Sequence, residues 1–185
     1  MKFIEHPLIK PGSVECREYQ MGLFRVCMKE DTLVVIPTGM GKTVIASLVI
    51  ADHLKKQPDK RCLLLAPTRP LTHQHHQFLL HHLNIDHGEV ECITGEDDVQ
   101  LRKAKWCNRV ICATPQITRS DIERGFINLK ETAVLIYDEA HRAVGNHSYS
   151  LISALFASTN PLGRSIGLTA SLPPDGEKVQ EILQN

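Results

Sequence analysis

The chain has 185 residues, and its 21 basic side chains (Lys and Arg) balance its 21 acidic ones (Asp and Glu). A chain of this length fits one domain, and the neutral balance argues against a stand-alone, charge-driven nucleic-acid binder, although it allows a local basic groove. No apolar run approaches the ~20 residues that a membrane-spanning helix needs, and the amino-terminal residues do not form a signal peptide. The 6 cysteines contain no CxxC pair, which favours a reducing cytoplasm. Cys62 and Cys112 lie in apolar strand-like runs, so we expect them to be buried.

Hydrophobic periodicity predicts helices that alternate with strands along almost the whole chain. Residues 1–12 are an irregular, proline-punctuated lead-in, and we expect Ser13 to cap a helix over 14–28. The predicted strands cover 32–36, 62–66, 89–93, 109–113, 133–137 and 165–168. The predicted helices cover 44–56, 71–83, 97–106, 116–124 and 149–157, with a short one after the proline-rich break at 173–176. This alternation predicts an α/β fold, in which a parallel β-sheet has helices on both faces and binds ligands at the carboxyl edge of its strands.

A glycine-rich turn links the first strand to its helix, and it reads Pro37-Thr38-Gly39-Met40-Gly41-Lys42-Thr43. Gly39 and Gly41 let the backbone turn tightly and present N–H groups to phosphate oxygens, above the positive end of the following helix. Lys42 can then reach the β- and γ-phosphates, and the Thr43 hydroxyl can ligate Mg²⁺. The general phosphate-binding pattern has a glycine where this chain has Ile36, but the strand–turn–helix context is present. The turn therefore predicts a nucleotide-binding loop.

A pair of acidic residues follows the fifth predicted strand directly. An NTP hydrolase needs such a pair opposite its phosphate-binding loop, at the same edge of the sheet. Asp138 can hold Mg²⁺, and Glu139 can orient and deprotonate the attacking water. Two exposed acids in a loop are the alternative, but Asp138 comes straight after a buried strand.

Two helices carry weaker signals. In the first, Gln20 could pair with both a donor and an acceptor on an adenine edge, and Tyr19 offers a ring face. The predicted helix over 71–83 is rich in histidine, at positions His73, His75, His76, His81 and His82. A metal site is one interpretation, but the imidazoles scatter around the helix and no acidic or cysteine partners follow at ligand spacing. We therefore favour a polar helix face that happens to use histidine.

Taken together, these clusters resemble the motor of superfamily 2 helicases of the DEAH-containing type. The segments that carry the resemblance are 17–20 (Arg-Glu-Tyr-Gln), 37–43, 67–71 (Pro-Thr-Arg-Pro-Leu), 94–95, 114–116, 138–141 (Asp-Glu-Ala-His) and 168–171 (Leu-Thr-Ala-Ser). The resemblance implies a RecA-like P-loop NTPase domain over 13–172, with a lead-in before it and a tail over 173–185 that leads towards a second lobe.

The resemblance also assigns roles to residues. It implies that Arg17 and Gln20 help the loop to bind ATP with Mg²⁺, and that Lys42 and Glu139 are catalytic. The nucleic-acid contacts that it implies come from Arg69, Thr94, Gly95, Thr114 and Gln116. The residues that it implies couple hydrolysis to movement are His141, Thr169 and Ser171.

A narrower match points to the archaeal Hef helicases and their FANCM relatives. It rests on residues 5–9 (Glu-His-Pro-Leu-Ile) and on the run 138–149, which extends well beyond the Asp-Glu-Ala-His core. The chain departs from that family at Leu172-Pro173-Pro174, where Pro-Gly is usual. The resemblance implies a motor that uses ATP to remodel forked or branched DNA. It also implies that ATP binds between this lobe and a second one. It would place the protein in an archaeal-type cytoplasm, or in the nucleus if eukaryotic.

Two alternatives stay open. One is an RNA-directed ATPase of the same superfamily, which senses or processes duplex RNA. The other is a nucleotide-binding module that hydrolyses nothing as it stands, because one lobe supplies only half of a phosphate cradle.

Overall fold

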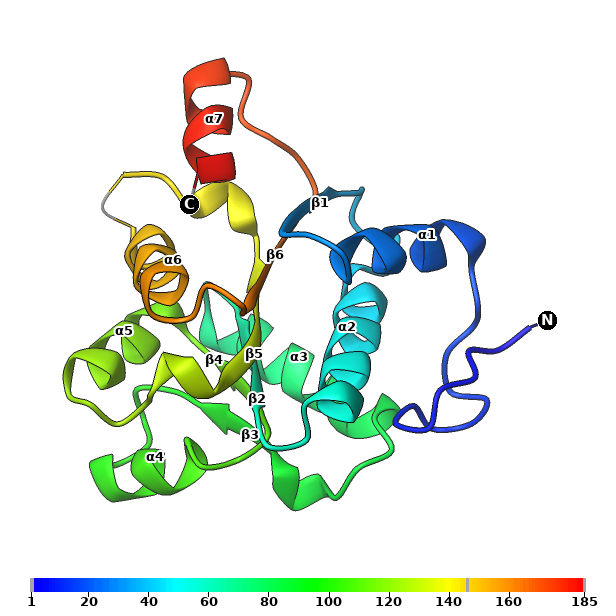
Figure 1. Cartoon of the computed structure of the whole chain (residues 1–185), viewed down its shortest axis with the longest axis horizontal. Coiled ribbons are helices and arrows are strands. Elements are labelled where there is room, and N and C mark those ends of the chain that lie inside the picture. Colours follow the sequence, from blue (N-terminus) through cyan, green and yellow to red (C-terminus); the bar gives the residue numbers. More distant parts are fainter. Residues whose placement is uncertain (1, 146, 185) are drawn as a thin grey trace.

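Parallel strands form a single sheet at the centre of the molecule (Figure 1). The computed structural model describes residues 2–145 and 147–184. Within these residues the strand order is β1-β6-β5-β2-β4-β3. The strands are β1 (Thr32–Val35), β2 (Arg61–Leu65), β3 (Val90–Ile93), β4 (Val110–Ala113), β5 (Thr132–Asp138) and β6 (Arg164–Thr169). The predicted parallel α/β architecture is confirmed.

Helices cover both faces of this sheet, as Figure 1 shows. One face carries α1 (Glu18–Cys27), α2 (Lys42–Lys56) and α3 (Arg69–His82). The other carries α4 (Val99–Lys105), α5 (Pro115–Glu123) and α6 (Ser148–Thr159). Short 3₁₀ turns lie at η1 (His87–Glu89), η2 (Leu129–Glu131) and η3 (Ala140–Arg142), and α7 (Gly176–Gln184) packs near η3.

The alternation of side chains along β5 explains why both faces are covered. Val134 and Ile136 belong to the core on the α2 side, whereas Leu135 and Tyr137 belong to the core on the α6 side. All four are buried, so the strand reads as a continuous apolar run. A strand of this kind needs a helix layer on each side.

Parallel register brings the strand ends to one edge. Val35 at the end of β1 pairs with Thr169 at the end of β6, and Asp138 at the end of β5 pairs with Leu168. The P-loop after β1 and the acidic pair after β5 therefore lie on either side of the end of β6. This order positions the candidate site.

The predicted start of the first helix is wrong by four residues, because α1 begins at Glu18 and not at 14. Val14 is buried in extended backbone, where its carbonyl accepts a hydrogen bond from Ile4 N–H at 2.9 Å. Ser13 donates to the Lys10 carbonyl and does not cap the helix. Pairing with the lead-in segment outweighs the helical pattern here. The other predicted boundaries of the strands and of α2 to α6 lie within two residues of the observed ones.

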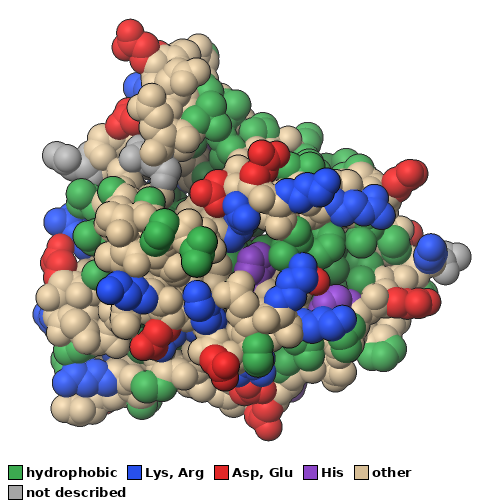
Figure 2. All heavy atoms as spheres, in the orientation of Figure 1, with side chains coloured by type: hydrophobic (Ala, Val, Ile, Leu, Met, Phe, Trp, Pro, Cys, Tyr) green, Lys and Arg blue, Asp and Glu red, His purple; other side chains and the backbone are tan. Residues whose placement is uncertain are grey.

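Cys62 and Cys112 are fully buried, as predicted, and burial raises the pKa of both thiols. In the described part of the chain, no helix is long and apolar enough to cross a membrane. Figure 2 shows acidic and basic side chains interspersed over the face in view, in keeping with the neutral balance of the sequence.

Candidate nucleotide site and nucleic-acid groove

The P-loop turns through two glycines in the left-handed region, Gly39 at φ 81° and Gly41 at φ 80°. Gly41 is the residue before α2, so it directs the first turn of that helix under the loop. A Cβ on Gly41 would overlap the side-chain amide of Gln20, whereas a Cβ on Gly39 would meet open space. Position 41 therefore needs glycine for two separate reasons, backbone angle and space.

The start of α2 is suited to an anion. Its first turn holds no acidic side chain, and its first residue is Lys42. The Lys42 ammonium donates to the Ile36 carbonyl at 3.4 Å, so the side chain folds back across the loop. Residues 37–40 are exposed in front of it. The N–H groups at the start of a helix, the positive end of its dipole and a lysine ammonium are together suited to bind a phosphate.

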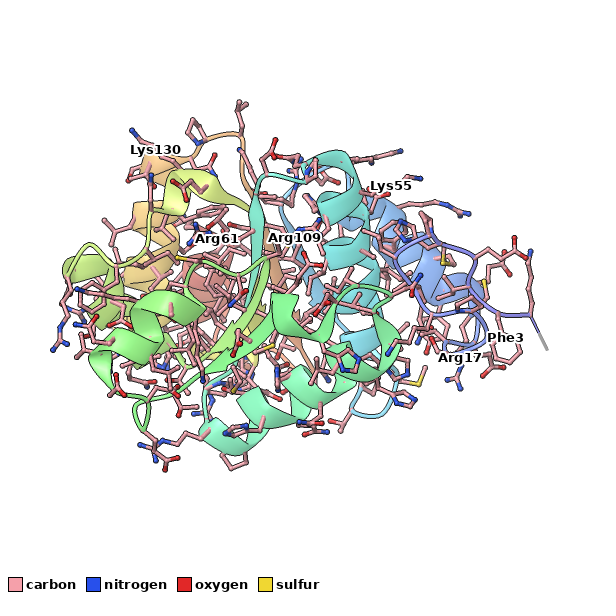
Figure 3. All side chains as sticks on the ribbon, turned by 90° about the horizontal axis from the view of Figure 1, so that it is seen from below. Phe3, Arg17, Lys55, Arg61, Arg109 and Lys130 are labelled. Carbon is pink, nitrogen blue, oxygen red and sulfur yellow. The ribbon has the colours of Figure 1, made fainter. Side chains whose placement is uncertain are left out.

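Helix α1 braces this loop from the side. Gln20 Nε2 donates to the Met40 carbonyl at 3.1 Å, and the Tyr19 hydroxyl donates to the same carbonyl at 2.7 Å. The other amide atom, Gln20 Oε1, is buried without a partner among the described residues. Arg17 instead pairs with Glu15 at 3.2 Å on the surface, and Figure 3 shows it at the edge of the molecule beside the amino-terminal segment. Gln20 thus reaches the loop, and Arg17 does not.

Asp138 is the last residue of β5, and it is buried. The Tyr149 hydroxyl donates to the Asp138 backbone carbonyl at 2.8 Å from α6. Burial, and then the neighbouring Asp138 charge, raises the pKa of Tyr149, which keeps this hydroxyl a donor. Glu139 follows at φ 53°, the one non-glycine residue with positive φ in 2–145 and 147–184. Backbone strain of this kind is common at functional sites, where it holds a side chain in a particular orientation.

The structure adds one residue that the sequence argument missed. His75 of α3 donates from Nε2 to Asp138 Oδ2 at 2.8 Å, and it is 5% exposed. The expectation of a merely polar helix face is therefore wrong for this histidine. The sequence feature that could have identified it is the spacing of Thr72, His75 and Leu79. This spacing places all three residues on one face of the helix, and that face is buried.

A chain of contacts joins the acidic turn to the P-loop. Glu139 Oε2 lies 3.3 Å from His141 Nδ1, which lies 2.9 Å from the Thr169 hydroxyl. That hydroxyl donates to the Ser171 carbonyl at 2.8 Å, and the Thr169 carbonyl accepts from Ile36 N–H at 3.1 Å. Glu139, His141, Thr169 and Ser171 therefore form one connected group at the end of β6.

Side chains alone do not form a metal site in the described part of the chain, where no group of three or more His, Cys, Asp and Glu could hold a metal ion. The residues do fit Mg²⁺ bound jointly with a nucleotide, because such ions take one or two protein oxygens and complete their shell with phosphate and water. The Asp138 carboxylate and the Thr43 hydroxyl are oxygen donors of that kind.

The predicted nucleic-acid residues gather around a separate hollow of about 390 Å³ at the ends of β2, β4 and β3. We call it the carboxyl-edge groove, and its lining is Pro67, Thr68, Arg69, Gly95, Thr114, Gln116 and Ile117. Arg69 forms an ion pair with Glu96, and both side chains are largely exposed. Thr94 is buried, and its backbone N–H donates to Asp97. Four of the five predicted residues thus line the groove, and Thr94 lies behind it.

Comparisons with known proteins agree with this arrangement. Residues 17–179 match the family described as DEAD/DEAH box helicase. The chain is 43% identical, over 99% of its length, to a Methanocaldococcus jannaschii protein that is provisionally named an ATP-dependent RNA helicase, and spans 23% of that protein. It is 35% identical, over 97% of its length, to the ATP-dependent DNA helicase MPH1 of Candida glabrata, and spans 17% of it.

The fold agrees as well. The Pyrococcus furiosus Hef helicase domain superposes with a TM-score of 0.92 and 34% identity, over 96% of this chain and 37% of that one. Of the run 138–149 that suggested this likeness, Asn146 lies outside the described residues. The sheet is RecA-like, and the stretch matched by the family includes both the P-loop and the Asp-Glu-Ala-His turn. The chain belongs to the DEAD/DEAH box helicase family.

Proposed function

We propose that this chain is the ATP-binding lobe of an ATP-dependent DNA helicase or translocase that acts on forked or branched DNA. The observation that carries the proposal is the meeting of the P-loop with Asp138 and Glu139 at one sheet edge, joined through Thr169. Residues 13–172 would form the RecA-like domain, and 173–185 would lead on towards a second lobe. The protein would act where its DNA lies, in an archaeal-type cytoplasm or a eukaryotic nucleus.

Each side chain has a distinct task in this mechanism. Mg²⁺, when bound with ATP, supplies charge neutralisation on the phosphates. Lys42 would bind the β- and γ-phosphates together with backbone N–H groups of the loop, and Thr43 and Asp138 would hold the ion. Glu139, which follows Asp138 at φ 53°, would orient the attacking water and take its proton.

The adenine would lie beside α1. Gln20 has a buried carbonyl oxygen without a partner among the described residues, and this oxygen can accept a hydrogen bond from an adenine amino group. Met40 is held in place by the other end of the same amide.

DNA would bind in the carboxyl-edge groove through its phosphates. Arg69 would supply positive charge for the phosphates. Gly95 would let the DNA backbone come close, and Thr114 and Gln116 would supply polar atoms for hydrogen bonds to it. The likeness to MPH1 and to Hef favours DNA. The provisional name of the Methanocaldococcus relative favours RNA, so an RNA-directed ATPase is the second candidate.

A second lobe would complete the active site. Every element described above supplies one wall of an ATP cleft, and none supplies an opposing arginine. An arginine finger is worth a factor of about 10³–10⁵ in rate. The 185-residue chain should therefore bind Mg-ATP but hydrolyse it very slowly and respond little to DNA.

Calorimetry with Mg-ATP on the 185-residue chain tests the nucleotide site. The Lys42→Ala variant should bind about 10- to 150-fold more weakly, because a charge-assisted contact contributes roughly 1.5–3 kcal/mol. Lys130→Ala, which removes the same charge from η2 before the amino end of β5 (Lys130 is labelled in Figure 3), should bind like the wild type. Equal affinity in both variants, with unchanged melting curves, would reject the assignment of Lys42.

Hydrolysis assays separate the two nucleic-acid candidates. A version of the protein that includes the second lobe should be stimulated by forked DNA far more than by duplex RNA. The reverse preference would replace the DNA proposal with the RNA one. Robust DNA-stimulated turnover by residues 1–185 alone would contradict the two-lobe proposal.

A further inference from the structure

The buried contact between His75 and Asp138 joins a helix to the residue that would hold the metal. His75 lies in the second turn of α3, and Asp138 ends β5, 63 positions further along the chain. Both side chains are 7% exposed, and Nε2 lies 2.8 Å from Oδ2. Among the described residues, no other side chain or backbone group donates a hydrogen bond to the Asp138 carboxylate. The orientation of that carboxylate therefore depends on the imidazole.

We propose that His75 is a positioning residue for the nucleotide-bound metal, an inference that rests on the function proposed above. Its Nε2–H holds Oδ2 of Asp138 and leaves the second carboxylate oxygen for the ion. A free aspartate can rotate about its last torsion, which has a broad, two-fold profile. A donor fixed to a rigid helix removes that freedom, as outer partners of metal-binding carboxylates do elsewhere.

The hydrogen-bond pattern of the ring distinguishes this role from a purely structural one. The Asp138 carboxylate only accepts, so a hydrogen of His75 lies on Nε2. Nδ1 is buried and has no partner in residues 2–145 and 147–184. A histidine that served the core alone would gain from using both nitrogens, since an unpaired buried polar atom costs free energy. The one hydrogen bond that this ring makes goes to Asp138.

The backbone of Asp138 is held by different groups. The Tyr149 hydroxyl, from α6 on the opposite face, lies 2.8 Å from the Asp138 carbonyl and 3.1 Å from the Leu65 carbonyl. Parallel pairing with Leu168 fixes the strand on one side, and pairing of Tyr137 with Leu65 fixes it on the other. Loss of the imidazole should therefore release the carboxylate without moving the strand.

The test compares nucleotide affinity with and without metal on the 185-residue chain. ATP is titrated in Mg²⁺ and again in EDTA, and the ratio of the two affinities reports the metal contribution. His75→Leu removes the donor and keeps an apolar side chain of similar reach. His75→Gln restores an N–H at the same number of bonds from Cβ. His81→Leu makes the same change at an exposed position of the same helix.

We expect His75→Leu to lower the Mg²⁺ ratio by about 10-fold or more, the range seen for outer partners of metal ligands. Affinity in EDTA should stay at the wild-type value, and His75→Gln and His81→Leu should keep the wild-type ratio. Electron paramagnetic resonance can measure Mn²⁺ bound together with ATP, without any turnover. The Mn²⁺ affinity should fall in His75→Leu and stay at the wild-type value in His75→Gln and His81→Leu.

Three results would overturn the inference while leaving the proposed function intact. They are an unchanged ratio in His75→Leu, an equal loss with and without metal, and a failure of His75→Gln to restore the ratio. If His75→Leu melts below the assay temperature, His75→Met carries the same comparison, because its flexible chain refills the space without an N–H. A wild-type chain that binds ATP no better with Mg²⁺ than without would overturn the proposed metal site and this inference together.

Discussion

His141 and Thr169 meet at the carboxyl edge of the sheet, with Nδ1 of the ring 2.9 Å from the threonine hydroxyl. The Thr169 backbone carbonyl in turn accepts from Ile36, the residue that precedes the P-loop. Thr169 thus contacts both the turn after β5 and the start of the P-loop. We propose that these contacts are the route by which a shift of that turn would reach the loop.

Replacing Thr169 with valine removes the hydroxyl and keeps the shape of the side chain. The variant should lose about 0.5–1.5 kcal/mol of unfolding free energy, the net contribution of a typical hydrogen bond. Affinity for Mg-ATP should stay near wild type, while stimulation of hydrolysis by DNA in the two-lobed protein should fall. Denaturant titration, calorimetry and a coupled ATPase assay measure the three quantities. Undiminished stimulation would remove Thr169 from the coupling group.

Glu139 has a strained backbone and a proposed role as the base, and two substitutions separate these properties. Glu139→Gln in the two-lobed protein should bind ATP normally but lose most turnover, because an amide cannot accept the proton of water. Glu139→Gly should also lose turnover, yet it should gain stability, since glycine adopts φ 53° without strain. Single-turnover hydrolysis and thermal melts check both. Near-normal turnover in the glutamine variant would exclude Glu139 as the base.

Arg69 should contact phosphates and not bases. Arg69→Ala should weaken binding of all DNA sequences to a similar extent and reduce the slope of log affinity against log salt by about one. The exposed ion pair with Glu96 is a weak competitor, because exposed pairs contribute little. Fluorescence anisotropy over a salt series measures the slope, and Lys130→Ala is the matched control. A loss confined to particular sequences would speak against backbone contacts.

His53 should make the chain less stable in mild acid. It is 6% exposed in α2, and burial lowers its pKa below the ordinary 6.5. Between the folded and unfolded pKa values the unfolded state binds more protons, so the unfolding free energy rises with pH and is lost as pH falls below about 6.5. Burial also lowers the pKa of His6 and His147, which act in the same direction.

Urea titrations at pH 7.5 and pH 5.5 measure this loss. The His53→Met variant, which keeps an apolar chain in the same place, should lose less stability between the two pH values than the wild type. An equal loss in both proteins would assign the acid sensitivity to other groups.

The parts of the site that sequence predicts well are those set by neighbouring residues. The P-loop and Asp138 each follow an apolar strand, and parallel topology then brings the two strand ends to one edge. The parts that sequence misses depend on distant contacts. Val14 leaves the predicted helix because it pairs with Ile4, and His75 reaches Asp138 across 63 positions. The spacing of Thr72, His75 and Leu79 could have placed His75 on the buried stripe of its helix, but it could not have identified the carboxylate that the ring contacts.

Helix α3 begins with Arg69 in the carboxyl-edge groove and carries His75 about 9 Å further along its axis, at 1.5 Å per residue. One helix therefore touches both the groove proposed to bind DNA phosphates and the carboxylate proposed to hold the metal. Linkage is reciprocal: if DNA bound at Arg69 raises the affinity for Mg-ATP by some factor, Mg-ATP must raise the affinity for DNA by that same factor. Each ligand would then be an effector of the other, and a single helix would connect the two sites.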